Sequence, residues 1–283
     1  MLTVKHRLSA LWNRTAVQPW ERIDAHFKGQ THVGALPARQ AALVTVATTC
    51  CMLVTLRYVV MDSDVQAQLG KAFVEIVGHL LPTCRPWAQR YEALWVHLTW
   101  ISGCIVVYVA VPAAVLHSVF RLPMREAFLV PHGYRRHLPI YAVLFLPVAL
   151  IVVIAARQPD FQMHYPFYNG MGLGDQLGWE LAYGLQFLAL EFFFRGFILR
   201  GLSAEMGASA VLAMAMPYCM LHYGKPLPEC VGSIVAGTVL GVLAMDTRSI
   251  WGGVTIHVAV AWTMDALALS QKGFRPLQDA LNQ

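Results

Sequence analysis

The sequence predicts an all-α protein, a polytopic membrane helical bundle with about seven transmembrane helices. The first observation is composition: 57% of the 283 residues are apolar and only 13% are charged, whereas an average soluble domain is about 25% charged. The second is a mean hydropathy of +0.51. The third is a series of apolar stretches close to the roughly 20 residues that a helix needs to cross a bilayer. We find no internal repeat or long polar linker that divides the chain.

Seven stretches are long and apolar enough to be spans: 41–61, 93–120, 138–156, 177–199, 206–223, 229–246 and 249–270. The segment 65–81 differs from them, because Lys71, Glu75 and His79 recur every four residues and give a helix one polar face. We expect this segment to be an interfacial helix that lies along the membrane surface. If it crossed the membrane instead, the number of spans would be eight.

The distribution of positive charge predicts the orientation. Residues 1–40 form a basic arm with six Lys and Arg, and the segment 121–137 carries four arginines. Because cytoplasmic loops are enriched in Lys and Arg, both segments are expected in the cytoplasm. We therefore expect a multi-pass protein of the cell (inner) membrane with a cytoplasmic N-terminus. A basic arm beside a span indicates a lipid bilayer as its partner and no nucleic acid.

Two charges interrupt the apolar run 177–199. Glu191 and Arg195 are four residues apart, so they share one helix face and can form an ion pair. Glu180 lies three turns earlier and projects to nearly the same side. Charges inside a span almost always face the bundle interior or a water-filled cavity, and they mark functional sites. A buried ion pair that only fixes helix packing is the alternative.

Two later spans contribute histidines. In "PYCMLHYGKPLPE" (217–229), His222 follows Tyr218 by one turn, and Glu229 begins the next helix. In "SIWGGVTIHVAVAWTMD" (249–265), His257 lies inside the final span. A glutamate and two histidines are the usual groups for activating water and stabilising an oxyanion. Alternatively, the histidines are packing residues, and Glu229 is an acidic residue that the helix dipole favours.

With these motifs, the sequence resembles the CPBP family (CAAX protease and bacteriocin-processing, or Abi) of integral membrane endopeptidases. The family has an EExxxR motif on one helix, FxxxH on a second and HxxxN on a later one. In this chain "LEFFFR" contains Glu191 and Arg195, "YCMLH" contains Tyr218 and His222, and "HVAVA" begins with His257. The order of the motifs matches that of the family, and the resemblance covers roughly residues 138–270.

Two positions depart from the family pattern. Leu190 stands where the family has its first glutamate, which activates water in CAAX-processing members, and Ala261 stands where the third motif has asparagine. The chain is similar to a bacterial branch that has one motif glutamate and an acidic residue after a GKP turn. In that branch, Glu229 would substitute for the missing carboxylate.

The resemblance implies an intramembrane endopeptidase that hydrolyses a peptide bond in a membrane-associated protein or peptide. Glu191 is the expected general base, and Arg195 orients it. His222 is expected to hold the water or relay its proton, and His257 to stabilise the oxyanion. No cofactor is expected. Zinc bound by the two histidines and Glu191, with or without Glu229, is the alternative, although the sequence has no HExxH motif.

A non-catalytic membrane protein that acts in immunity, or as a chaperone or scaffold, is the alternative from another class, and the departures at Leu190 and Ala261 favour it. In either case we expect four regions. They are a basic cytoplasmic arm, an N-terminal transmembrane region that includes the interfacial helix, the CPBP-like core and a polar tail, at 1–40, 41–137, 138–270 and 271–283.

Overall fold

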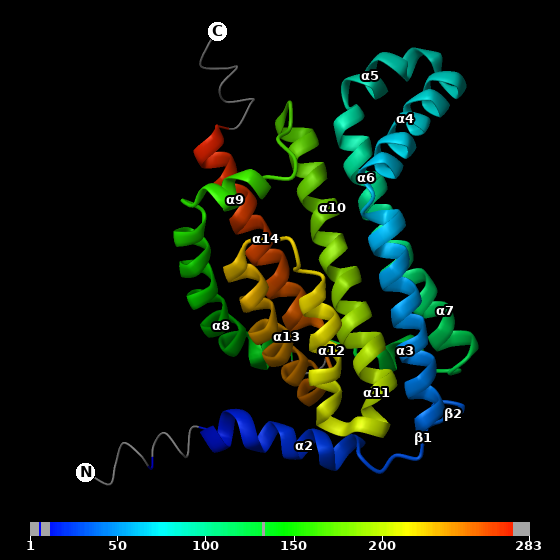
Figure 1. The fold of residues 1–283 in the computed structure, drawn as a ribbon, viewed down its shortest axis with the longest axis vertical. Coiled ribbons are helices and arrows are strands. Elements are labelled where there is room, and N and C mark those ends of the chain that lie inside the picture. The colour runs from blue at the N-terminus through cyan, green and yellow to red at the C-terminus, as the bar shows by residue number, and fades with distance from the viewer. Residues whose placement is uncertain (1–5, 7–11, 132–133, 274–283) are drawn as a thin grey trace. The chain divides into compact units, whose positions relative to one another are not determined.

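The computed structural model describes residue 6, residues 12–131 and residues 134–273, and these are almost entirely helical (Figure 1). Parts of the predicted arm 1–40 and of the predicted tail 271–283 lie outside the described residues. The chain divides into two compact units. Unit 1 comprises Met1–Thr49, Pro112–Pro139 and Glu191–Gly253, and unit 2 comprises Cys50–Val111, Ile140–Leu190 and Val254–Gln283.

The described residues confirm the predicted membrane helical bundle. Six helical stretches are long and apolar enough to cross a membrane: Ala38–Val60, Glu92–Ser118, His137–Ala155, Leu173–Met220, Leu227–Thr247 and Trp251–Lys272. The fourth of them is 48 residues long and is not a single helix, because the chain reverses within it at Gly207. It therefore contains two of the seven predicted spans.

The reversal at Gly207 joins α11 (Leu199–Met206) to α12 (Ala210–Met220) through the short η7 (Gly207–Ser209). Gly207 has a φ of +58°, a conformation that favours glycine. A side chain there would also meet the Asp24 carboxylate, which accepts a hydrogen bond of 2.8 Å from the backbone N–H of Ala208. Asp24 thus provides a hydrogen-bond acceptor for a backbone N–H group of the turn η7, which precedes α12.

The helix α13 (Leu227–Thr247) packs along α12 in unit 1. Glycines on α13 allow this close packing: a Cβ atom at Gly237 would lie 2.9 Å from the Tyr218 ring, and one at Gly241 would lie 2.9 Å from Val211. These contacts hold Tyr218, and the turn that follows α12, in a fixed position.

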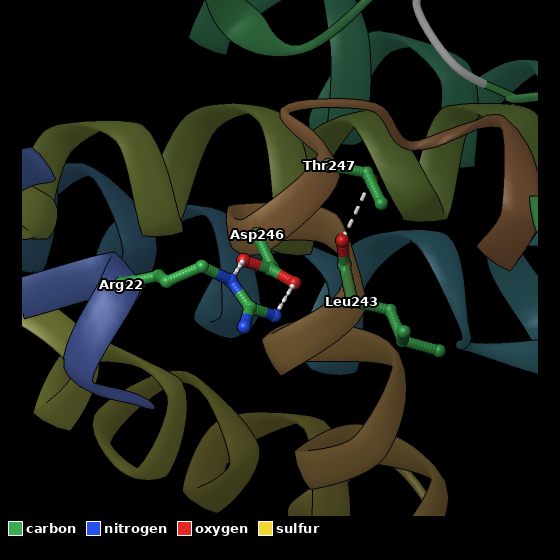
Figure 2. A network of polar contacts seen from close by, with 4 residues as sticks. All are labelled: Arg22, Leu243, Asp246 and Thr247. Carbon is green, nitrogen blue, oxygen red and sulfur yellow. Dashed lines mark hydrogen bonds and ion pairs between the residues drawn. The ribbon is translucent and has the colours of Figure 1, made fainter. Parts of the chain in front are cut away.

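Unit 1 also contains a helix that the sequence analysis missed, α2 (Gln18–Phe27), which follows η1 (Asn13–Val17). Its apolar face, formed by Pro19, Ile23 and Phe27, is buried. On its polar side, Arg22 donates hydrogen bonds of 2.8 and 2.6 Å to the two carboxylate oxygens of Asp246, as Figure 2 shows. Through this pair, α2 is fastened to the C-terminal end of α13.

The remaining elements of unit 1 are short or shared with unit 2. The strands β1 (His32–Val33) and β2 (Leu36–Pro37) pair antiparallel, with His32 opposite Pro37. Three further elements follow in chain order: α3 (Ala38–Thr55), α7 (Val111–Ser118) and η5 (Met124–Ala127). The segment η6 (Phe192–Ile198) precedes α11 and carries the candidate site.

Unit 2 consists of helices that pack around an aromatic core. Its elements are η2 (Leu56–Val60), α4 (Ser63–Leu80), η3 (Pro82–Cys84), α5 (Arg85–Arg90), α6 (Glu92–Ile105), η4 (Val106–Ala110), most of α8 (Tyr134–Ala155), α9 (Pro159–His164), most of α10 (Leu173–Glu191) and most of α14 (Trp251–Lys272). The rings of Trp179 and Tyr183 stack with their centroids 5.1 Å apart. The Trp179 indole N–H donates to the buried carboxylate of Asp265 at 3.2 Å.

The helix α4 coincides with the predicted segment 65–81. Asp62 caps it by accepting hydrogen bonds of 3.0 Å from the backbone N–H groups of Asp64 and Val65. The predicted polar residues Lys71, Glu75 and His79 are all exposed, whereas the opposite face is buried and packs on α6. The segment is therefore amphipathic as predicted, and its interfacial location stays a prediction.

Candidate active site

Glu191 and Arg195 form an ion pair in the interior of unit 1. The Arg195 Nη1 atom lies 3.1 Å from Glu191 Oε1, and both side chains are fully buried. The predicted ion pair is thus formed. An isolated charge would be very unfavourable at this depth, so each charge depends on the other.

This pair lies where the helix geometry changes. Glu191 is the last residue of α10, and Arg195 is in the middle of η6, whose seven residues are all buried. Seven residues of π-helical geometry are unusual, because π turns are rare and occur mostly as local bulges, frequently at functional sites. Gly196 follows the arginine, and a Cβ there would lie 2.8 Å from the Ala127 carbonyl oxygen, so η5 packs directly against this turn.

Tyr218 of α12 forms the wall beside the arginine. The Arg195 guanidinium carbon lies 4.4 Å from the centroid of the Tyr218 ring, which is a cation–π arrangement. Phe194 packs edge-on against the same ring at 5.3 Å. The tyrosine is 2% exposed, so the guanidinium is held between a carboxylate and an aromatic face without access to bulk water.

His222 lies in the turn after α12 and contacts Tyr218. Its ring centroid is 4.9 Å from that of Tyr218, and its Nδ1 atom is 2.9 Å from the Tyr218 carbonyl oxygen. Because a carbonyl only accepts, Nδ1 is the donor in this hydrogen bond. In the neutral imidazole the Nε2 atom then carries the lone pair and can accept a proton.

The glutamate also touches the beginning of α14. A Cβ atom on Gly253 would overlap with the Glu191 carboxylate oxygens, so the carboxylate lies directly against the glycine backbone. Gly253 is in the first turn of α14, where backbone N–H groups lack partners within the helix. The positive end of the helix dipole and Arg195 together stabilise a carboxylate at this position.

The start of α14 is fixed by contacts within unit 1. The indole N–H of Trp251 donates a 2.7 Å hydrogen bond to the Leu129 carbonyl oxygen. One residue earlier, the backbone N–H of Ile250 donates to the Phe128 carbonyl oxygen at 3.0 Å. These two bonds hold the first turn of α14, and hence Gly253, in position.

Glu229 is paired with a different cation. The Lys225 ammonium lies 2.5 Å from a Glu229 carboxylate oxygen, one turn away across the start of α13. Both side chains are partly exposed, at 31% and 22%. Glu229 is nevertheless one of the charged groups, with Glu191 and Arg195, that act electrostatically on Tyr218. Glu229 is therefore partly exposed and within electrostatic range of Tyr218.

The remaining predicted site residue belongs to unit 2. The His257 ring on α14 stacks face to face on Phe187 of α10, with centroids 5.7 Å apart and an angle of 4° between the planes. The two positions that depart from the family pattern, Leu190 and Ala261, are buried at 7% and 4% exposure. Ala261 packs in the aromatic core with Trp179 and Tyr183, where no polar side chain is required.

Two further residues, Gly253 and Asp265, were not predicted from the sequence. Gly253 contacts Glu191 although the two residues are far apart in the sequence. The one sequence signal for this contact is the pair of glycines at 252–253, because glycines within an apolar span allow another segment to pack closely. Asp265 is a fully buried acid on α14. A carboxylate within a span is itself a signal of function or of hydrogen bonding, and here the Trp179 indole is its partner.

No three His, Cys, Asp or Glu side chains among the described residues come together as a metal site would need. In unit 1 the Glu191 carboxylate faces the Arg195 guanidinium instead. The partner that the structure shows for the Glu191 carboxylate is thus a guanidinium, and the metal dependence of the protein stays a prediction.

A comparison with known families gives a match for this part of the chain. Residues 178–263 match the family model of the type II CAAX prenyl endopeptidase Rce1-like proteins, and all of the residues discussed as catalytic candidates lie inside this range. No curated protein and no solved structure matches the chain significantly. Residues 178–263 of the chain are thus similar to the Rce1-like CAAX proteases, which is consistent with the predicted resemblance to the CPBP family.

Proposed function

We propose that the protein is an intramembrane endopeptidase in which Glu191 activates the water that hydrolyses the peptide bond. The observation that carries this proposal is the fully buried Glu191–Arg195 pair, which is in contact with Tyr218 inside the Rce1-like domain. Apolar residues of similar volume often stabilise a protein interior as well as a buried ion pair does. A requirement for packing alone therefore does not explain why two charged residues are found at this depth.

In the proposed reaction, Glu191 takes a proton from water while the water oxygen forms a bond to the carbonyl carbon of the substrate. The resulting tetrahedral intermediate carries an oxyanion, for which His257 is the proposed hydrogen-bond donor. The proton held by Glu191 then moves to the leaving nitrogen as the C–N bond breaks. His222 is proposed to hold the water or to relay this proton.

Arg195 has a positioning role in this scheme. Its guanidinium is fixed by the Tyr218 ring on one side, so it presents Nη1 to Glu191 in one geometry. The same positive charge stabilises the carboxylate, which is the form of Glu191 that can accept a proton from water.

Glu229 supports a second version of the mechanism. It has a partly exposed carboxylate, and Lys225 rather than a buried group neutralises it. In this version Glu229 substitutes for the glutamate that the family has at position 190. The variants Glu191→Gln and Glu229→Gln distinguish the two versions.

The proposed substrate is a membrane-associated protein or peptide, and the lipid bilayer is the surrounding partner. Multi-pass insertion in the cell (inner) membrane with a cytoplasmic N-terminus is proposed on the basis of the basic arm and the arginine-rich segment 121–137. Zinc dependence is the alternative to a metal-free reaction. We expect 1,10-phenanthroline to leave proteolysis unchanged, whereas a loss that added zinc restores would support a metalloprotease.

A non-catalytic role is the second candidate function, because Leu190 and Ala261 fill two family positions with buried apolar side chains. The Glu191→Gln variant tests the two candidates. Gln preserves the shape of the side chain but is not a base, so proteolysis of a membrane-associated substrate should fall by about 10²–10⁴-fold. Unchanged biological function in this variant would instead favour the scaffold role.

A further inference from the structure

A surface pocket lies in unit 1 between α2 and the C-terminal end of α13. Its volume is about 160 Å³, and its lining residues are Arg22, Ile23, His26, Met245, Asp246 and Arg248. A water molecule needs only roughly 10–15 Å³ of such space, so the pocket accommodates a larger polar group. Three of the six lining residues have basic side chains, whereas only one is acidic.

The acidic residue is already neutralised. Asp246 accepts two parallel hydrogen bonds from Arg22, through the Nε and Nη2 atoms (Figure 2). This bidentate pair removes one negative and one positive charge from the balance of the pocket. The pair also raises the pKa of Arg22, because the hydrogen bonds to Asp246 stabilise the guanidinium.

Arg248 supplies a positive charge that the fold does not neutralise. It is exposed, and among the described residues no carboxylate lies within ion-pair distance of it. Its backbone adopts the left-handed conformation that ends α13, with a φ of +54°. This conformation turns the chain at the edge of the pocket.

A second arginine near the pocket is almost fully buried. The side chain of Arg200 is 10% exposed, and its Nη2 atom donates a 3.1 Å hydrogen bond to Glu126. Its Nη1 atom is buried and has no hydrogen-bond acceptor among the described residues. Arg200 does not line the pocket, and it acts there through its positive charge.

The positive charges of Arg248 and Arg200 affect the pKa of His26, which lines the pocket. Burial, Arg248 and Arg200, in that order, lower the pKa of His26. The charged groups that face this histidine are therefore Arg248, Arg200 and the neutralised pair Arg22–Asp246. An anion bound among them would reverse the effect of the two arginines and favour protonation of His26.

The location of the pocket indicates which anion is available to it. The 21 residues of α13 form an apolar span about 32 Å long at 1.5 Å per residue, close to the roughly 30 Å of a hydrocarbon core. The end of α13 therefore lies at the level of the lipid headgroups. Lys and Arg at this level are attracted to anionic phospholipids.

We infer that this pocket binds the phosphate group of an anionic phospholipid, with Arg248 as the principal cation, protonated His26 beside it and the charge of buried Arg200 in support. The C-terminal dipole of α13 opposes an anion here by a fraction of a charge, which the full charge of Arg248 outweighs. This inference does not depend on the proposed protease activity, because it concerns a different surface of unit 1.

The test is a calorimetric titration of the full-length protein in a non-ionic detergent with dihexanoyl phosphatidic acid. We expect saturable binding that is at least tenfold tighter than for dihexanoyl phosphatidylcholine or inorganic phosphate. The ratio of the affinities for phosphatidic acid at pH 5.5 and pH 7.5 should be higher for the wild type than for the variant His26→Asn, because the lipid phosphate itself ionises identically in both titrations. Inorganic phosphate binding as tightly as the lipid would overturn the lipid assignment.

The matched pair Arg248→Asn and Arg121→Asn separates the site from general surface charge. Both arginines are exposed, both have a φ of +54°, and only Arg248 lines the pocket. Asn tolerates this conformation, and melting temperatures check that both variants fold. Should Arg248→Asn melt early, Arg248→Gln replaces it. We expect about a tenfold loss of affinity for Arg248→Asn and none for Arg121→Asn, and an equal loss in both, or no loss, would overturn the proposal.

Discussion

The carboxylate of Glu191 lies so close to Gly253 that no side chain fits between them. This contact joins the last residue of α10 to the first turn of α14 and places a carboxylate at a helix N-terminus. Because an added Cβ atom at position 253 would overlap with the carboxylate, the geometry of the ion pair requires glycine there.

We therefore predict that Gly253→Ala displaces Glu191 and lowers both proteolysis and stability. Alanine is favoured over glycine in a helix by about 1 kcal/mol, so a lower melting temperature in this variant would have to come from the steric overlap. Gly232→Ala is the control, because Gly232 is also helical and has no atom within 4 Å of an added Cβ. Equal behaviour of the two variants would contradict the contact.

The ion pair predicts a specific pattern of stabilities. Arg195→Met leaves the Glu191 carboxylate buried without its counter-charge and should lower the free energy of unfolding by about 3–5 kcal/mol. The double variant Glu191→Gln and Arg195→Met removes both charges and should recover most of this loss, but not proteolysis. Denaturation in detergent and a peptide-cleavage assay measure the two effects. Activity in the double variant would exclude Glu191 as the base.

Glu229→Gln should be nearly neutral for stability, because partly exposed ion pairs such as Lys225–Glu229 contribute about 0–1 kcal/mol. Proteolysis gives the informative result. If Glu191 alone is the base, activity should change only a few-fold. A loss as large as that of Glu191→Gln would show that both carboxylates take part in the reaction.

His26 predicts a pH dependence of stability. Its pKa is lowered in the folded protein, so the unfolded chain binds the proton first as the pH falls. The contribution of His26 to stability is complete above its unfolded pKa of about 6.5 and is lost as the pH falls below that value. Melting temperatures at pH 7.5 and 5.5 in phosphate-free buffer should differ less for His26→Asn than for the wild type. The same slope in both would contradict the assignment.

The spans could be predicted because their signal is local. Each depends on the hydropathy of about 20 consecutive residues, so every predicted span has a helical counterpart in the structure. The helix α2 was missed because residues 1–40 were interpreted only by their charge. Pro19, Ile23 and Phe27 recur every four residues and would have indicated an amphipathic helix.

The site was predictable in its residues but not in its contacts. The i,i+4 spacing of Glu191 and Arg195 implies their ion pair without any tertiary information. The Tyr218 ring beside Arg195 and the Gly253 backbone beside Glu191 depend on how α12 and the start of α14 pack, which no local pattern encodes. The change from α- to π-helical geometry at Phe192 could not be predicted either, because the apolar residues 192–194 show no periodicity that distinguishes the two geometries.

The hydrogen bond from Ala208 to Asp24 joins residues 184 positions apart, and this has a consequence for how the chain is made. Asp24 is synthesised long before Ala208. The contact between α2 and the turn after α11 can therefore form only after several spans have been made and inserted. Deletion of residues 18–28 should therefore act late in biogenesis. The spans would still insert, but the hairpin of α11 and α12 would close slowly and become exposed to membrane quality-control proteases.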